Sequence, residues 1–301
     1  MLRRSARAFP PTMLKSLAKR MLPAPAIAFV RLCRQRGLLV AASLSWRQRA
    51  LRKAFEAGNR NVPADQIEIR PGLRFKVNKE ARGGFEYFAF RDAEMCDELD
   101  GFLRLSRGRK VLWDIGALHG IFSMAFCGEN HGKALAFEPS PVATPVLRDN
   151  LARNSDLSIR HLCCAVGEER GKARFELFWH HACALGEGES GAPGQVIEVD
   201  VVTLDELLSK EEPPDTIKID VEGYEFRVLK GARRVLGEFH PLVFLEIHPE
   251  VLGRWGTAIA EIYAFLEGFG YAIVDPSGSP VSAAAVARDG LVRRVVCLPP
   301  G

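Results

Sequence analysis

The feature that most constrains the fold is an alternation of apolar, strand-like runs with helical segments that begins after Lys110. The runs are nearly continuous in apolar residues, which is typical of strands buried on both faces. Such strands separated by helices predict a parallel, doubly wound α/β sheet. We expect strands in 110–116, 133–140, 158–167, 215–223, 241–249, 271–275 and 291–298, and helices in 121–127, 141–154, 224–236 and 257–268.

Two other parts of the chain depart from this alternation. Residues 172–179 and 195–208 predict a β excursion that returns to a short helix. Residues 66–78 alternate apolar and polar side chains around a Pro-Gly pair, which is typical of a small β-hairpin, and 86–105 predict a helix. We therefore divide the chain into a basic helical extension (1–60), a small β/α lead-in segment (61–108) and a main domain (109–301).

Positive charge is concentrated at the N-terminus. Residues 1–60 contain 14 Lys and Arg residues and one acid, Glu56, whereas the rest contains 27 Lys and Arg against 36 Asp and Glu. Such a run is usually a solvated helical face, and attachment to an anionic membrane surface is the second interpretation. Nucleic-acid binding is the weakest, since interleaved aromatic residues are few. A targeting peptide is not indicated, because prolines break its apolar run.

The seven cysteines are scattered and form no CxxC pair. This pattern indicates reduced thiols in a cytoplasmic protein, not a disulfide framework or a zinc site. No apolar run approaches the roughly 20 residues that a membrane span needs. We therefore predict a cytoplasmic protein that can also be peripheral at a membrane through residues 1–60. The sequence does not indicate the oligomeric state.

The first strand of the main domain ends in a glycine-rich turn. Asp114 closes the apolar run, and Gly116 and Gly120 allow a tight turn into a helix whose first N–H groups lack intrahelical partners. Glu138 ends the next strand, 22 residues after Gly116, where a carboxylate can accept hydrogen bonds from both ribose hydroxyls of an adenosyl ligand. Because ligands bind at the carboxyl ends of such strands, these segments predict an adenosyl-ligand site.

The spacing of the glycines in the turn distinguishes between two adenosyl ligands, NAD and S-adenosylmethionine. A dinucleotide site uses GxGxxG, whereas this turn is GxxxG and contains His119. The Asp114 carboxylate is unfavourable beside a pyrophosphate but attracts the cationic amino group of a methionine moiety. The turn therefore favours S-adenosylmethionine over NAD. An NAD-dependent oxidoreductase is further disfavoured because no catalytic dyad is recognisable.

Three separated blocks give the chain a family resemblance. They are "WDIGALHGIFS", "AFEPSP", and "IKIDVEGYEFRVLKGARRVL" with "PLVFLEIHP". Over about residues 85–275 the sequence resembles the FkbM family of class I S-adenosylmethionine-dependent methyltransferases, and the third block is the most specific. The resemblance implies a Rossmann-like seven-stranded sheet whose last strand is antiparallel. It also implies O-methyl transfer to a hydroxyl of a small-molecule, sugar or glycan, or lipid-linked acceptor.

The resemblance also implies the cofactor-binding residues by position. These are Asp114, Gly116, Ala117, His119 and Gly120 in the turn, Glu138 and Pro139 at the ribose, and Ala165 and Val166 beside the adenine. One position departs from the family's usual G-A-N-x-G turn, because Leu118 replaces the asparagine. His119 stands where an apolar residue is usual. The departure either removes a polar contact to the cofactor or lets His119 supply a substitute donor.

The segment "IKIDVEG" carries the first candidate catalytic residues. Lys218, Asp220 and Glu222 occupy alternate positions, hence one side of a regular strand end. Buried charges there are costly unless they are paired or functional. A structural ion pair of Lys218 with Asp220 explains them as well as catalysis does. In the functional interpretation Asp220 or Glu222 is the base or orients the acceptor hydroxyl, and Lys218 lowers the pKa of the acid.

On the neighbouring strand, Glu246 and His248 repeat this arrangement. His248 is a candidate general base at neutral pH, and equally a hydrogen-bonded histidine at the rim. With Asp220 and Glu222 these residues would suit a divalent metal clamp for a vicinal diol or catechol, but the spacing requires no metal and we predict none. The alternative to an enzyme is a non-catalytic adenosyl-binding scaffold protein, which Leu118 alone supports.

Overall fold

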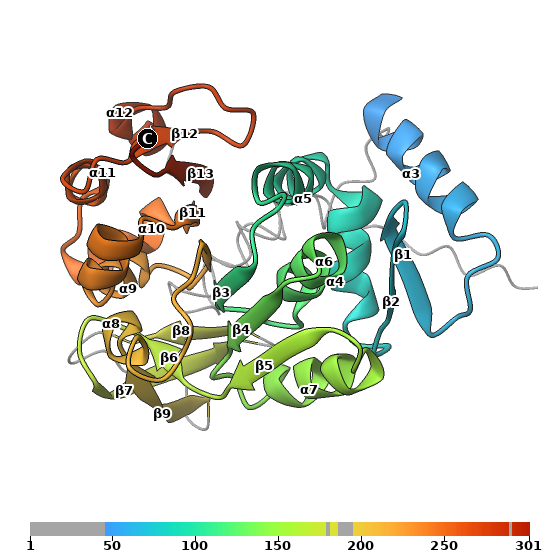
Figure 1. Cartoon of the computed structure of the whole chain (residues 1–301), viewed down its shortest axis with the longest axis horizontal. Coiled ribbons are helices and arrows are strands. Elements are labelled where there is room, and N and C mark those ends of the chain that lie inside the picture. Colours follow the sequence, from blue (N-terminus) through green and yellow to red (C-terminus); the bar gives the residue numbers. More distant parts are fainter. Residues whose placement is uncertain (1–45, 179–180, 186–194, 289–290) are drawn as a thin grey trace, which may run out of the picture. The chain divides into compact units, whose positions relative to one another are not determined.

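A seven-stranded sheet forms the centre of the computed structural model, which describes residues 46–178, 181–185, 195–288 and 291–301 (Figure 1). Its spatial order is β12 (Ala272–Val274), β13 (Arg293–Leu298), β11 (Leu242–Ile247), β10 (Thr216–Ile219), β3 (Val111–Ile115), β4 (Lys133–Phe137) and β5 (Ser158–Leu162). Neighbouring strands from β11 to β5 are parallel. The last strand, β13, is antiparallel to both of its neighbours. The predicted Rossmann-like α/β sheet with an antiparallel last strand is therefore confirmed.

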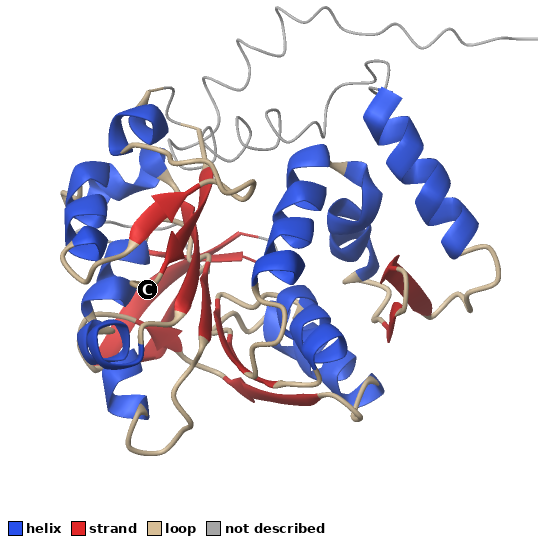
Figure 2. Cartoon of the chain, turned by 45° about the horizontal axis from the view of Figure 1, so that its top comes forward, coloured by secondary structure: helices blue, strands red, loops and turns tan. Residues whose placement is uncertain are grey.

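Helices cover both faces of this sheet (Figure 2). One face packs against α5 (Ala93–Leu105), α6 (Ile121–Asn130) and α7 (Ala143–Arg153). The other packs against α8 (Leu204–Leu207), α9 (Glu225–Lys230), α10 (Pro249–Leu252), α11 (Ile259–Glu267) and α12 (Ala283–Ala287). Side chains alternate between two apolar cores because successive strand residues point to opposite faces. Trp113, for example, lies in the second core, whereas its neighbour Leu112 lies in the first.

Two smaller sheets complete the strands. β1 (Gln66–Arg70) and β2 (Leu73–Lys76) form the predicted antiparallel hairpin. The predicted β excursion is a four-stranded sheet in the order β6 (Ala165–Val166), β9 (Val196–Val202), β7 (Gly171–Phe178) and β8 (His181–Ala184). Hairpin residues Ile67 and Phe75 share an apolar core with Phe102 and Phe244. The segment before the main domain is thus packed onto the sheet, while the divisions at residues 60 and 108 stay predictions.

Two predicted helices are interrupted in the structure. The helix expected over 86–105 breaks at Asp92, whose side chain accepts hydrogen bonds from Glu94 N and Met95 N and so caps α5. Before it lie α4 (Arg82–Glu86) and a π-helical turn, Tyr87–Arg91. The helix expected over 224–236 breaks at Gly231, where a Cβ atom would lie 2.0 Å from the Gly167 carbonyl oxygen. A second π-helical turn, Val235–Phe239, follows, and a 3₁₀ turn spans Gly253–Trp255.

The predicted basic extension is described only in part. Its helix α3 spans Trp46–Gly58, and Phe55 of this helix stacks on Phe90 with 4.4 Å between ring centroids. Residues 1–45 lie outside the described residues, as does the whole glycine-rich stretch 186–194. Within the described ranges, the helices are all too short or too polar to cross a membrane.

Candidate active site

The glycine turn after β3 has an unusual backbone. Gly116 and Gly120 have φ of 82° and 86°, and Leu118 between them has φ of 48°. The N–H groups of Gly116 and Ala117 both donate to the Phe137 carbonyl oxygen, at 3.0 Å each. The turn is therefore tied to the end of β4, where the sequence placed the ribose-binding acid.

Close packing explains both glycines. A Cβ atom on Gly116 would lie 1.9 Å from the backbone oxygen of Asp220, and one on Gly120 would lie 2.7 Å from Leu147 Cδ1. Either contact is far shorter than real Cβ atoms show, and positive φ adds strain for any side chain. The glycines are thus required by neighbouring protein atoms, and Gly116 brings the turn directly against the segment of Asp220.

Asp114 at the end of β3 is almost completely buried. Its Oδ2 accepts hydrogen bonds from the N–H and the hydroxyl of Ser123, at 3.1 and 2.6 Å, and so anchors the first turn of α6. Burial raises the pKa of Asp114, although Lys218 opposes the shift. Its Oδ1 is buried with no hydrogen-bond partner among the described residues. Such an acceptor fits a cationic ligand group.

Glu138 connects the two loops at the carboxyl ends of β3 and β4. Its Oε2 accepts from Leu118 N and its Oε1 from Ser140 N, both at 2.8 Å. These bonds orient a carboxylate whose oxygens offer about four acceptor positions in all. Pro139, half-buried, follows directly. The structure thus brings Glu138 to the turn, as the sequence analysis expected.

The other predicted cofactor residues lie nearby in the fold. Ala117 and His119 are buried in the turn, and the His119 carbonyl oxygen accepts a hydrogen bond from Asn150 Nδ2. Ala165 and Val166 are buried in β6, where they pair with β9. The exposed residue that directly follows β5 is Cys163, which the sequence analysis did not select.

A charged row crosses one face of the sheet beside this turn. Lys218 lies opposite Asp114 in the register of β10 and β3, and Glu246 lies opposite Arg294 in β11 and β13. The side chains of all four residues point to the face of the sheet that packs against α5 and α6, because side chains alternate between the two faces along a strand. From α5, Glu98 approaches the row: it pairs with Arg294 and lies 3.9 Å from Lys218 Nζ.

Lys218 and Asp220 form the ion pair that the sequence analysis considered. Their Nζ and Oδ2 atoms are 3.3 Å apart, and the ammonium also lies 4.4 Å from the centre of the Phe122 ring. Burial lowers the pKa of Lys218, but Asp220 and Glu98 outweigh it, so the net direction is upward. Lys218 is therefore a permanent cation, and Asp220, with 27% of its side chain exposed, is the more accessible partner.

Glu222 does not continue the strand. β10 ends at Ile219, and Glu222 adopts φ of 53°, in the left-handed region. The expectation of three charges on one regular strand side is therefore wrong for Glu222: its Oε2 meets His248 instead, 3.3 Å from Nε2.

His248 is buried, with 2% of its surface exposed, beyond the end of β11. Its Nδ1 lies 2.7 Å from Glu225 Oε1, a hydrogen bond that fixes the ring. Burial lowers the pKa of His248, but Glu222 and Glu225 outweigh it and raise the pKa to about 10. At neutral pH the imidazole is thus protonated, which disfavours His248 as a general base and makes it a cationic partner of the nearby carboxylates.

Glu246 lies between two cationic side chains and completes what we call the charged cluster, which consists of Glu98, Lys218, Asp220, Glu222, Glu225, Glu246, His248 and Arg294. Arg294 Nη2 lies 2.8 Å from Glu246 Oε1, and His248 Nε2 lies 3.9 Å from the same oxygen. Burial and the nearby Asp220 carboxylate raise the pKa of Glu246. Three members of the cluster were not predicted as site residues: Glu98, Glu225 and Arg294. No sequence signal singled them out, because each has other charged residues beside it in its own helix or strand.

Comparison with known proteins identifies the family of this site. A family model described as the methyltransferase FkbM domain matches residues 114–273, more than half of the chain. The chain belongs to this family. Residues 114–273 are therefore a methyltransferase FkbM domain.

Two curated relatives are similar to part of the chain. The hexuronic acid methyltransferase AglP of Haloferax volcanii is 31% identical over 146 residues, which cover 47% of this chain and 57% of that protein. The methyltransferase sdnD of Sordaria araneosa is 30% identical over 151 residues, covering 39% and 58%. The matches thus span less than two thirds of the length of either relative.

Solved structures are similar at a lower level. A methyltransferase FkbM from Methylobacillus flagellatus is 16% identical, with a TM-score of 0.45, over 95% of this chain and 76% of that one. A precorrin-6y C5,15-methyltransferase from Geobacter metallireducens is 17% identical, with a TM-score of 0.40, over 68% and 86%.

The residues present fit S-adenosylmethionine. The unpartnered, buried Oδ1 of Asp114 is an acceptor suited to a cationic group, and the cofactor carries both an ammonium and a sulfonium. Glu138 presents an oriented carboxylate at the adjacent strand end, which suits two ribose hydroxyls. Both acids lie at the carboxyl edge of the sheet, where ligands bind in doubly wound folds.

Proposed function

We propose that this protein is a methyltransferase that takes a methyl group from S-adenosylmethionine and transfers it to a hydroxyl of a small-molecule or sugar acceptor. The observation that carries the proposal is the position of Asp220. Its carboxylate is partly exposed at the carboxyl end of β10, and its backbone packs against Gly116 of the predicted cofactor turn. A carboxylate next to the donor's binding turn can accept the proton that a hydroxyl nucleophile must lose.

The surrounding charges prepare Asp220 for this role. S-adenosylmethionine, when bound, supplies a methyl group already activated by a sulfonium. The chain's own residues have to orient the hydroxyl and hold its proton. Lys218 and His248 approach opposite oxygens of Asp220, at 3.3 and 3.9 Å, and keep the carboxylate in place. Glu222, 19% exposed beside His248, is the second candidate to contact the acceptor.

The name of one curated relative supports a choice of acceptor class to test. One of them is named for a hexuronic acid, a sugar that carries hydroxyls and a carboxylate. We propose a hydroxylated sugar or glycan as the first acceptor class to test, with other hydroxylated small molecules next. A cytoplasmic location, and contact of residues 1–60 with an anionic membrane surface, remain part of this proposal.

Turnover of an acceptor panel tests the proposed function. Purified protein is incubated with S-adenosylmethionine and hexuronic acid glycosides or other hydroxylated molecules, and S-adenosylhomocysteine and the methylated product are measured. Asp220→Asn should reduce turnover roughly 10²- to 10⁴-fold, the usual contribution of a general base, whereas Glu198→Gln, an exposed acid on β9, should have no effect. Product methylated on nitrogen or carbon would contradict hydroxyl transfer. Cofactor binding without turnover would favour the scaffold alternative.

A further inference from the structure

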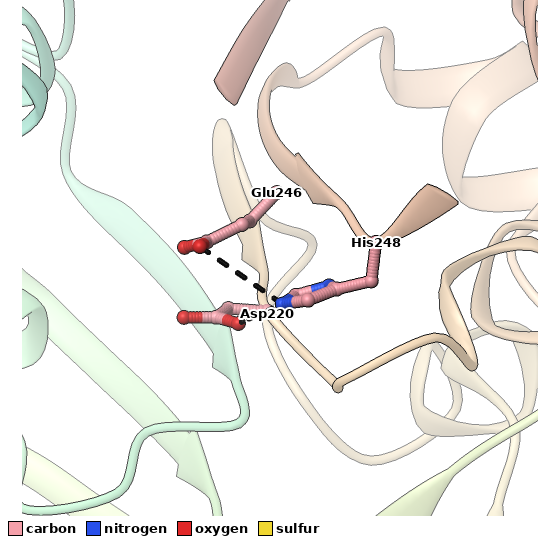
Figure 3. Close-up of side chains that lie close together, drawn as sticks. All are labelled: Asp220, Glu246 and His248. Atoms are coloured by element: carbon pink, nitrogen blue, oxygen red, sulfur yellow. Dashed lines mark ion pairs between the residues drawn. The ribbon is translucent and has the colours of Figure 1, made fainter. Parts of the chain in front are cut away.

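Three side chains of the charged cluster converge on one point. Asp220, Glu246 and His248 each offer one ligand atom, and these atoms all lie within 4.8 Å of one another (Figure 3). His248 Nε2 is 3.9 Å from Asp220 Oδ1 and 3.9 Å from Glu246 Oε1. Ligand bonds of about 2.1 Å to a divalent ion place adjacent ligands about 3 Å apart and opposite ligands about 4.2 Å apart. Both separations from His248 Nε2 fall in this interval.

The imidazole is held so that one nitrogen faces the carboxylates. Glu225 binds Nδ1 at 2.7 Å, and both residues are buried. Nε2 is buried and makes no hydrogen bond to any residue that the structure describes, although Glu222 Oε2 lies 3.3 Å from it. A histidine whose far nitrogen is bound by a carboxylate is the arrangement that orients metal-ligating histidines. An oriented, buried nitrogen without a hydrogen bond therefore points to a ligand.

Acids outnumber bases around this nitrogen. The carboxylates within the cluster are those of Glu98, Asp220, Glu222, Glu225 and Glu246, against the three side-chain cations of Lys218, Arg294 and the protonated His248. A metal ion bound at Nε2 would take the place of the proton on that nitrogen. Lys218 contacts Oδ2 of Asp220, so that Oδ1 is the oxygen facing His248. An enclosed excess of negative charge is costly, and a divalent cation would offset most of it.

We propose that Asp220, Glu246 and His248 bind a divalent cation that holds two neighbouring oxygens of the acceptor. Two carboxylates suit Mg²⁺ or Mn²⁺, and the imidazole favours Mn²⁺ of the two. Three protein ligands leave coordination positions for the acceptor, as a vicinal diol or a hydroxyl beside a carboxylate would provide. This departs from the expectation that the site needs no metal. The acceptor part rests on the proposed function, whereas the cation site stands on its own geometry.

Binding of Mn²⁺ alone tests the cation site without any turnover. Electron paramagnetic resonance measures free Mn²⁺ during titration of the full chain, and pulsed spectra of the bound ion report nitrogen ligands. We expect one Mn²⁺ per chain with coupling to one imidazole nitrogen. Asp220→Asn should weaken binding at least about tenfold, while the matched control Glu198→Gln should bind as the wild type does.

The outcomes separate the inference from the proposed function. Bound Mn²⁺ without nitrogen coupling in the wild-type protein would overturn the site even if every variant failed to fold. Equal affinity of Asp220→Asn and the wild type would overturn it as well. Hydroxyl methylation that continues unchanged in excess chelator, with no Mn²⁺ bound, would refute the cation while leaving the proposed function intact. Mn²⁺ bound with nitrogen coupling, but no methylation of any hydroxyl, would support the site and refute the function.

Discussion

The two faces of strands β10 and β11 differ sharply in what they bury. One face buries Ile217, Val243 and Leu245 in an apolar core, where desolvation stabilises the fold. The opposite face buries Lys218 and Glu246, whose desolvation opposes folding unless partners offset it. An apolar side chain would fill either position without this cost. The comparison teaches that the charged face serves something other than folding, and that its charges depend on one another.

Removing one charge should have the largest effect on stability. Lys218→Met leaves Asp220 and Glu98 without their shared cation and should destabilise the protein by roughly 3–5 kcal/mol, as for other buried pairs broken on one side. Denaturant unfolding measures the change. The double variant Lys218→Met/Glu98→Gln should recover part of the loss. If Lys218→Met were as stable as the wild type, the charges would not be mutually dependent.

A truncation on the apolar face sharpens the comparison. Leu245→Ala should destabilise by about 3 kcal/mol, because it removes buried methyl groups and leaves a cavity. Leu245 is buried away from the charged cluster, so KM and kcat of the folded variant should equal those of the wild type. Steady-state kinetics at a temperature well below unfolding checks this, and a large fall in kcat would mean that the two faces are not functionally separate.

The pKa of His248 predicts how stability changes with pH. Because folding raises this pKa from 6.5 to about 10, its contribution is complete below pH 6.5 and is lost as the pH rises toward 10. Between pH 7 and pH 9 the loss should be on the order of 2 kcal/mol, measured by denaturant unfolding at each pH. The raised pKa values of Asp114 and Glu246 act in the same direction. Glu225→Gln removes a carboxylate that stabilises the protonated His248 and should therefore make stability depend less on pH. Wild-type stability that rises between pH 7 and pH 9 would contradict the raised pKa of His248.

The smallest expected effect is at the glycine turn. Leu118 has φ of 48°, a conformation that costs a non-glycine residue roughly 1–2 kcal/mol and that asparagine adopts more readily. Leu118→Asn should therefore stabilise the protein by roughly 0.5–1 kcal/mol, seen as a higher unfolding midpoint. Leu118→Ala, which keeps the unfavourable conformation, is the control. An equal gain in both variants would assign the effect to the side chain and not to the backbone.

Much of the fold was predictable because it follows from patterning. Apolar runs and glycine turns predicted the order of the strands. The break of the 224–236 helix at Gly231 was not predicted, because it depends on contact with Gly167, 64 residues away. Asp114, Gly116 and Glu138 were predictable for the same reason: each stands at a strand end that the pattern marks.

The charged cluster was predictable only in part. Asp220 and His248 directly follow strands and Glu246 lies within one, and all three were visible as acids and a histidine in apolar surroundings. Glu98 and Arg294 come from a helix and from the last strand, 196 residues apart, and no local pattern relates them. Likewise, the raised pKa of His248 arises from Glu222 and Glu225, which reach it from other segments of the chain.

Calorimetric titration with S-adenosylhomocysteine tests the central claim most directly: that the β3–β4 edge holds the cofactor while the adjacent β10–β11 edge does the chemistry. The wild type and Asp220→Asn should bind with similar affinity, whereas Glu138→Gln, folded by its unfolding midpoint, should bind at least about tenfold more weakly because a charged hydrogen-bond acceptor is lost. Wild-type affinity in Glu138→Gln, or loss of binding in Asp220→Asn alone, would contradict this division of the site.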